Sequence, residues 1–243
     1  MPPPYPLARP DISDEDIQAV VTVLQSGHLS CGKTIDVFEK EFAKYVGVDH
    51  AVAVSSGTSA LHLCVSALDI QEGDEVITTP FSFVASSNCA LFEKAKPVFV
   101  DILPDTLCID PDGIEAAITE KTKAIVAVDV FGYLADYDAL QALATQHHLA
   151  LIEDSCEALG THCDGQKAGS FGDAGVFGFY PNKQITTGEG GMITTNRSDI
   201  ADLARSMRNQ GRALNDAFLT HERLGYNYRL SDINCALGIS QLQ

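Results

Sequence analysis

The sequence predicts an α/β fold of three layers (α-β-α), in which helices cover both faces of a mostly parallel central sheet. Short apolar segments, such as residues 124–128 and 149–152, alternate along the chain with amphipathic segments of helical length. The short segments are apolar throughout, which is typical of strands buried on both faces of a parallel sheet. At 243 residues, with 45% hydrophobic and 20% charged residues, the chain is long enough for one large globular domain.

The chain begins with two predicted helices. Ser13 precedes the acidic residues 14–16, which is the pattern of an N-cap with negative charges in the first helical turn. This helix is expected to run to about Ser26 and to stop at Gly27. A second helix is predicted over residues 34–45, where apolar side chains recur every three or four positions.

The rest of the chain has the alternation expected of parallel strands joined by helices. The predicted strands cover residues 51–55, 75–78, 98–101, 124–128, 149–153 and 192–195. The predicted helices cover residues 58–68, a segment that opens at 110–111, and residues 136–147, 198–209 and 230–243. Ligands of such sheets bind beyond the carboxyl ends of the strands, so polar residues at those ends are the candidates for function.

The domain organisation follows from the last predicted helix. It has neither a Gly nor a Pro stop before Gln243. A domain rarely finishes inside a running amphipathic helix. We therefore expect residues 1–243 to form a large domain with an N-terminal helical segment, and a smaller C-terminal domain to be absent.

Composition excludes several classes of function. The formal net charge of −17 argues against nucleic-acid binding, and the apolar runs are too short to span a membrane. The opening Met1-Pro2-Pro3-Pro4 has no basic segment followed by an apolar one, so we expect a cytoplasmic protein without a secretory signal. Seven Cys residues are scattered without a CxxC pair, which predicts reduced core thiols and neither a metal site nor a disulfide framework.

The first candidate site feature is the turn Ser55-Ser56-Gly57-Thr58-Ser59, which links a predicted strand to a predicted helix. Backbone N–H groups and the helix dipole bind phosphate at such a position, and Gly57 lets the backbone approach a ligand closely. The same turn is also compatible with a plain helix cap. It therefore predicts a phosphate site only in combination with other features.

The second feature is the pair Glu153-Asp154 at the end of a predicted strand. A carboxylate there is suited to pair with a protonated ring nitrogen, as the electron-withdrawing ring of pyridoxal 5'-phosphate (PLP) requires. A metal ligand and a helix cap remain alternative interpretations.

The third feature is Lys183, which lies between the aromatic residues 179–180 and the Gly-rich residues 188–191. A lysine that forms a Schiff base must be neutral when it attacks, so it needs a partly buried site. A surface-loop lysine is the alternative.

The fourth feature is the segment 79–83, which follows another predicted strand and carries Phe81 and Phe83. These rings offer flat faces for stacking on a cofactor. Core packing is the alternative for both.

Taken in chain order, these features are a phosphate turn, an aromatic platform, a strand-end aspartate and a lysine. The chain resembles the DegT/DnrJ/EryC1/StrS family of PLP-dependent nucleotide-sugar aminotransferases, in the aspartate aminotransferase superfamily of fold type I. The resemblance runs from Leu7-Ala8-Arg9-Pro10 and Ser26-Gly27-His28-Leu29 through Gly225-Tyr226-Asn227-Tyr228-Arg229-Leu230-Ser231-Asp232. It is most specific over residues 179–191. It implies the large domain of a fold type I PLP enzyme.

The resemblance also implies roles for residues of this chain. Lys183 would form the internal Schiff base and shuttle the proton, and Asp154 would pair with the pyridinium nitrogen. Gly57 and Thr58 would bind the phosphate, while Phe83 would stack on the ring. Members with His at the lysine position are dehydratases, so Lys183 favours the transaminases.

Further implied contacts concern Glu157 and Asn227. Glu157 would lie near the 3-hydroxyl of the cofactor, where many members have His or Gln. Asn227 would reach the phosphate in a neighbouring subunit, which implies a homodimer with shared sites. Many members have Ser at the position of Gly178, so a phosphate contact made by that hydroxyl is missing here.

The activity expected from the resemblance is transfer of an amino group from an amino acid, first of all glutamate, to a nucleotide-linked keto-deoxysugar. A 4-keto-6-deoxy sugar for cell-surface polysaccharide or glycan synthesis is the first choice. Two alternatives stay open: another PLP enzyme of the same fold, such as a dehydratase or lyase, and a truncated non-catalytic regulatory subunit.

Overall fold

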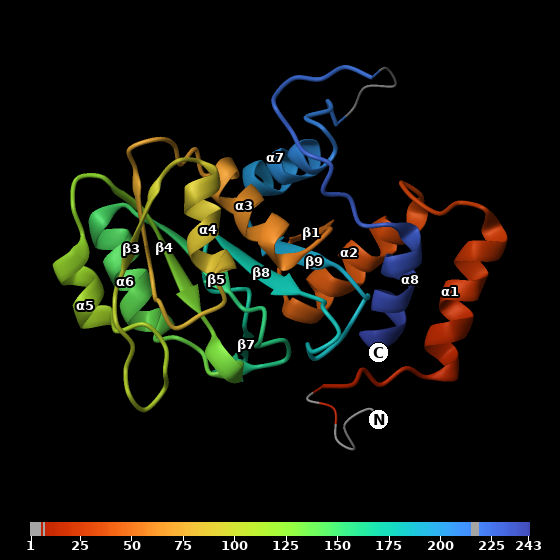
Figure 1. Ribbon diagram of the computed structural model, residues 1–243, viewed down its shortest axis with the longest axis horizontal. Helices are drawn as coiled ribbons and strands as arrows, with labels where there is room; N and C mark the ends of the chain where they lie inside the picture. The colour runs from red at the N-terminus through yellow and green to blue at the C-terminus, as the bar shows by residue number, and fades with distance from the viewer. Residues whose placement is uncertain (1–5, 7, 215–218) are drawn as a thin grey trace.

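The computed structural model describes residues 6, 8–214 and 219–243, and Figure 1 shows its arrangement. The strands are β1 (His50–Val54), β2 (Glu75–Thr78), β3 (Lys96–Phe99), β4 (Thr122–Val128), β5 (Ala150–Asp154), β6 (His162–Cys163), β7 (Gln166–Lys167), β8 (Ala174–Gly178) and β9 (Gly191–Thr195). The helices are α1 (Asp14–Ser26), α2 (Lys33–Val46), α3 (Gly57–Ala67), α4 (Ala85–Phe92), α5 (Pro111–Ala117), α6 (Tyr137–His147), α7 (Ser198–Arg208) and α8 (Asp232–Gln241), with a 3₁₀ turn at Val130–Gly132.

Seven strands form the central sheet in the order β1-β9-β8-β5-β4-β2-β3, and β6 pairs with β7 in a separate hairpin. Strands β3, β2, β4, β5 and β8 run parallel to one another, whereas β9 is antiparallel to both β8 and β1. The predicted mostly parallel sheet is therefore confirmed, and the carboxyl ends of its parallel strands meet at one edge.

Helices cover both faces of the sheet, which confirms the three predicted layers. On one face, α3, α4 and α7 pack against alternate strand residues such as Val126 and Ile152 (Figure 1). On the other face, Ile125 and Leu151 pack against α5 and α6. At the β1 end of that face, the rings of Phe38 and other aromatic residues fill a third core beneath α2 and α8. Successive side chains along each strand point to opposite faces of the sheet, so one core layer lies on each face.

Local sequence accounts for most helix ends. Ser13 and Asp16 form the reciprocal capping box of α1, and Gly27 ends that helix in the left-handed conformation with φ of 74°. Asp110 caps α5 and Asp136 caps α6, each through its side chain. Helix α2 has no local cap. Instead, the carboxylate of the buried Asp232 accepts the amides of Gly32 and Thr34 (2.8 and 3.0 Å).

Some sequence predictions were wrong. Strand β8 was not predicted, because Gly175 and Gly178 lower strand propensity in a five-residue segment. Strand β3 begins two residues before its predicted start, and Pro97 is accommodated there because β3 is an edge strand. The last helix ends at Gln241 and does not run on through the final residue.

The cysteine prediction was right only in part. All seven thiols are free, and four of them are buried, but Cys31 and Cys163 are exposed. Across the described ranges, no helix is long and apolar enough to cross a membrane. The segment Met1-Pro2-Pro3-Pro4, which carried the prediction about a signal, lies outside the described residues, as does Leu7 of the resemblance.

Candidate active site

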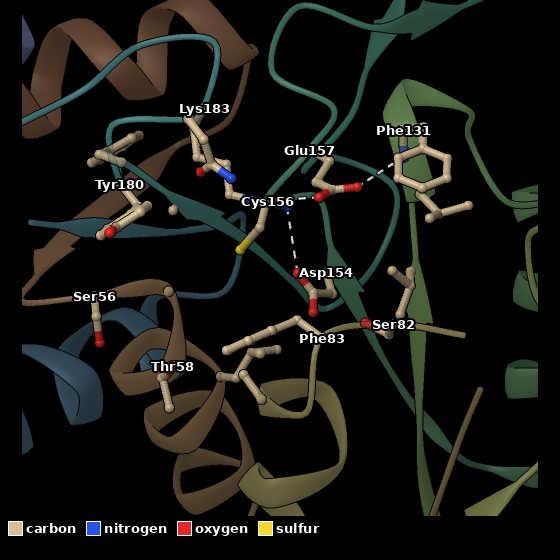
Figure 2. Close-up of a pocket in the computed structure, with 18 of the residues that line it drawn as sticks. Ser56, Thr58, Ser82, Phe83, Phe131, Asp154, Cys156, Glu157, Tyr180 and Lys183 are labelled. Atoms are coloured by element: carbon tan, nitrogen blue, oxygen red, sulfur yellow. Dashed lines mark hydrogen bonds and ion pairs between the residues drawn. The ribbon is translucent and has the colours of Figure 1, made fainter. Parts of the chain in front are cut away.

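A cavity of about 760 Å³ opens at the carboxyl ends of β4 and β5, on the face covered by α3 and α4. Figure 2 shows Lys183, Asp154, Phe83 and Thr58 around this cavity. The fold therefore brings together four segments that are far apart in the sequence. The volume lies within the range typical of small-molecule sites.

Helix α3 points its N-terminus into the cavity. Ser56 caps the helix by accepting the amide of Ser59 (3.0 Å), whereas the amides of Gly57 and Thr58 have no acceptor among the described residues. These two N–H groups and the positive end of the helix dipole are free to bind an anion. A Cβ at Gly57 would lie 2.9 Å from Cys156 Sγ, so a side chain there would narrow the site.

Asp154 ends β5 and is buried beside the cavity, with 6% of its surface exposed. Its Oδ2 accepts a hydrogen bond of 2.6 Å from Ser86 Oγ on α4, and its Oδ1 receives only a long contact of 3.4 Å from the amide of Cys156. The thiol of Cys156 lies next to this carboxylate. Burial and then the charge of Asp154 hold the pKa of that thiol well above its usual value.

Asp129 lies behind this site at the end of β4. Its carboxylate accepts from Ser155 Oγ, Tyr137 Oη and the amide of Ala135 (2.6, 2.9 and 3.1 Å). Complete burial raises the pKa of Asp129 to about 7, although these donors oppose the shift. Asp129 thus holds together the segments that follow β4 and β5 through its hydrogen bonds to Ser155, Tyr137 and Ala135.

Lys183 extends from the loop between β8 and β9, with its side chain 18% exposed. Its Nζ lies 3.3 Å from Oε1 of Glu157, and the amide of Lys183 donates to the carbonyl of Tyr180 (2.9 Å). Oε2 of Glu157 accepts the amide of Phe131 (3.0 Å). Glu157 therefore joins the lysine loop to the turn after β4.

Aromatic side chains line the mouth of the cavity. Phe83 is 78% exposed and projects over the opening from the turn that precedes α4 (Figure 2). Phe81 and Phe131 meet edge to face, with ring centroids 6.1 Å apart. At this exposure the ring of Phe83 is not part of the core, so core packing does not account for it.

The structure brings six of the seven predicted site residues to one cavity. These residues are Gly57, Thr58, Phe83, Asp154, Glu157 and Lys183. Asn227 is the exception: it is exposed, forms a backbone bridge with Asn209 and does not line the cavity. Its predicted contact involves a second subunit, so it stays a prediction.

Sequence reasoning did not single out several residues of the site. Ser82 and Ser86 are separated by four positions around Phe83, and this spacing is the signal that could have revealed them. Phe131 has the left-handed backbone conformation (φ 52°, ψ 23°), for which the sequence carries no signal except the following Gly132.

These groups fit PLP. An anion-binding helix end, a carboxylate with an open oxygen, a partly exposed aromatic ring and a lysine amine all face one cavity. They correspond to the phosphate, the ring nitrogen, the ring face and the aldehyde of that cofactor. Across the described ranges, no group of three or more His, Cys, Asp or Glu side chains could hold a metal ion.

The sequence model of the DegT/DnrJ/EryC1/StrS aminotransferase family matches residues 10–243. A GDP-perosamine synthase of Vibrio cholerae is 41% identical over 239 residues, which are 98% of this chain and 65% of that relative. The chain thus spans about 65% of the length of the curated relatives it matches.

Solved structures resemble the fold closely. PseC of Helicobacter pylori, an aminotransferase involved in the biosynthesis of pseudoaminic acid, superimposes with a TM-score of 0.93 at 38% identity, over 98% of this chain and 65% of that one. The PLP form of a putative sugar aminotransferase of Streptococcus pneumoniae gives a TM-score of 0.93 at 30% identity, over 98% of this chain and 66% of that one.

Proposed function

Because this chain belongs to the DegT/DnrJ/EryC1/StrS aminotransferase family, whose members are PLP-dependent, we propose that it is the cofactor-binding part of a nucleotide-sugar aminotransferase. The observation that carries the proposal is that Lys183 and Asp154 line the same cavity, at the carboxyl ends of the parallel strands. A protein that only bound a partner would need neither residue in that place.

The residues divide the work as follows. When bound, PLP withdraws electrons from the Cα of the amino substrate. Lys183 is the attachment point of the cofactor and the base that moves the Cα proton. Asp154 keeps the ring nitrogen protonated, so negative charge spreads into the ring. The amides of Gly57 and Thr58 bind the phosphate, and Phe83 covers one face of the ring.

Glu157 and Asn227 complete the proposed site. Glu157 holds the amine of Lys183 on the side where the 3-hydroxyl would lie. Asn227 is exposed on the surface, which suits a contact with the phosphate in a partner subunit. We therefore propose a homodimer with shared sites, working in the cytoplasm. Sedimentation analysis of the wild type and Asn227→Ala, each titrated with PLP, tests this arrangement: the variant should remain a dimer but lose cofactor affinity.

The proposed substrates are an amino-acid donor, glutamate, and a nucleotide-linked 4-keto-6-deoxy sugar. The names of the relatives, GDP-perosamine synthase and the pseudoaminic acid enzyme PseC, support an amino-sugar product. A role in polysaccharide biosynthesis is supported by the spore coat polysaccharide biosynthesis protein SpsC of Bacillus subtilis, which is 42% identical over 247 residues. We propose residues 1–243 as the large domain of such an enzyme.

Absorbance spectroscopy of the purified protein with PLP tests this function. We expect a visible band that depends on Lys183 and that is lost when glutamate converts the cofactor to its amino form. The control is Lys167→Ala, because Lys167 binds the carbonyl of Tyr45 and does not line the cavity. A band that persists in Lys183→Ala would contradict the proposal. A Lys183-dependent band that glutamate does not change would favour a lyase or a non-catalytic subunit.

A further inference from the structure

Two serine hydroxyls form a chain behind the carboxylate of Asp154. Ser86 Oγ lies 2.6 Å from Asp154 Oδ2, and Ser82 Oγ lies 2.7 Å from Ser86 Oγ. Ser86 is 1% exposed, whereas Ser82 is half-buried and lines the cavity. The chain therefore runs from the cavity wall to the carboxylate through a residue that solvent does not reach.

The direction of each hydrogen bond follows from counting protons. In the function proposed above, Asp154 is ionised, and a carboxylate only accepts hydrogen bonds. Ser86 must therefore donate its single hydroxyl proton to Asp154. Because that proton is used, the contact with Ser82 requires Ser82 to donate and Ser86 to accept. The competing acceptor for Ser86, the carbonyl of Phe83, is more distant at 3.3 Å.

This arrangement treats the two oxygens of Asp154 differently. Oδ2 receives the short bond from Ser86, while Oδ1 receives the long 3.4 Å contact from the amide of Cys156, whose thiol also lies next to the carboxylate. Short bonds to an ionised acceptor are strong and fix its orientation. The carboxylate of Asp129, another buried acid of the site, accepts from donors of its own and has no hydrogen bond to the side chain of Asp154.

We propose that Ser86 is a positioning residue, supported by Ser82, that fixes the Asp154 carboxylate so that Oδ1 faces the ring nitrogen of the cofactor. This inference rests on the proposed function. It deepens that function by assigning the orientation of the essential carboxylate to two hydroxyls from another segment of the chain.

The local backbone explains why one segment performs both tasks. The amide of Ser86 donates to the carbonyl of Phe83 (3.2 Å) in the turn that begins α4. This turn holds the Phe83 ring at the opening of the cavity and places the hydroxyls of Ser82 and Ser86 on the side of Asp154. The group that covers the ring face and the groups that orient the carboxylate are thus held by a single turn.

The test measures PLP labelled with ¹⁵N at the ring nitrogen, bound to the purified chain, by NMR and by titration of the absorbance band. Ser86→Ala should lower the affinity for PLP about tenfold, consistent with the loss of a hydrogen bond to a charged group. It should also move the ring ¹⁵N resonance toward that of unprotonated PLP. Ser86→Thr, which keeps the hydroxyl, should restore the wild-type resonance.

Ser87→Ala is the matched control. Ser87 lies next to Ser86 on α4, but its hydroxyl donates to the carbonyl of Val84 (3.0 Å) and not to Asp154. Ser87 does not line the cavity. This variant should keep the wild-type resonance and affinity. Ser82→Ala should move the resonance in the same direction as Ser86→Ala but by less, because Ser82 acts only through Ser86.

The outcomes separate this inference from the proposed function. If the wild type shows no Lys183-dependent band, the proposed function fails before the serines are tested. If the wild type binds PLP and Ser86→Ala has the same ¹⁵N resonance as Ser87→Ala, the positioning role is wrong. Should Ser86→Ala fail to fold, Ser82→Ala decides: a resonance equal to that of Ser87→Ala would overturn the inference.

Discussion

Two neighbouring carboxylates at the end of β5, Glu153 and Asp154, point to opposite faces of the sheet and have different surroundings. Glu153 is fully buried and accepts three backbone amides, from Gly169, Phe171 and Gly172, at 2.6–2.7 Å. Asp154 faces the cavity and is held by the hydroxyl of Ser86. One carboxylate therefore organises a loop, while the other keeps an oxygen open to a ligand.

The same contrast recurs along β8 in its two glycines. A Cβ at Gly175 would lie 2.4 Å from the Cα of Gly169 and 2.8 Å from its carbonyl oxygen. A Cβ at Gly178, beside the cavity, would meet Cys156 Sγ at 3.5 Å, which is an ordinary contact. The loop around Gly169 leaves no space for a side chain at Gly175, whereas the cavity wall has space for one at Gly178. We therefore expect substitutions on the buried side to change the stability of the fold and substitutions beside the cavity to change ligand binding or catalysis.

The largest expected effect is that of Asp154→Asn. Removing the charge that pairs with the ring nitrogen should slow the half-reaction with glutamate about a thousandfold. The free energy of unfolding should change by less than about 1 kcal/mol, since Asn can still accept from Ser86. Single-turnover absorbance and urea unfolding measure the two quantities. A rate within tenfold of the wild type would remove Asp154 from the proposed role.

Glu153→Leu should have the opposite profile. It leaves the amides of Gly169, Phe171 and Gly172 without their acceptor, so we expect the free energy of unfolding to fall by about 3 kcal/mol. Urea unfolding of this variant beside Asp154→Asn measures the contrast. Equal stability of the two variants would mean that the contacts of Glu153 do not contribute more to the stability of the fold than those of Asp154.

Gly175→Ala should destabilise the chain by about 2 kcal/mol, because the added methyl group meets backbone atoms that cannot rotate away. Thermal unfolding is the measurement, and Gly178→Ala on the same strand is the control. An unfolding temperature unchanged by Gly175→Ala would show that the loop around Gly169 can move.

The pH dependence of stability offers a separate test of Glu153. Burial raises the pKa of Glu153 from its ordinary 4.5 to about 8, with a contribution from the nearby charge of Asp129. Between these values the folded chain holds a proton that the unfolded chain has released, so the free energy of unfolding should decrease as pH rises. Glu153→Gln cannot titrate. The stability of the wild type relative to this variant should therefore be greatest near pH 4.5 and fall toward pH 8 in urea titrations.

Gly178→Ser should have the smallest effect. The added side chain has space beside Cys156, because a Cβ at Gly178 would meet Cys156 Sγ at an ordinary contact distance of 3.5 Å. We expect the affinity for PLP to rise about threefold through one further hydrogen bond, with unchanged stability. Absorbance titration measures the affinity. A loss of affinity would mean that the phosphate does not lie beside Gly178.

Local patterns in the sequence determined the elements and the order of the site. The Ser13 cap, the Gly27 stop and the apolar strands around residues 124–128 and 149–152 are short-range features, and the structure confirms them. Lys183 and Asp154 could also be selected from the sequence, but only because they follow the Gly57-Thr58 turn and Phe83 in the order that the family resemblance requires.

Only the tertiary structure decided how those residues are supported. Strand β8 forms despite its glycines because it pairs with β5 and β9, and its surroundings leave no space for a side chain at Gly175. The division of labour between Glu153 and Asp154 depends on which sheet face each one meets, and the Ser86 bond joins positions 68 residues apart. Such contacts depend on packing between distant segments, so no local pattern encodes them.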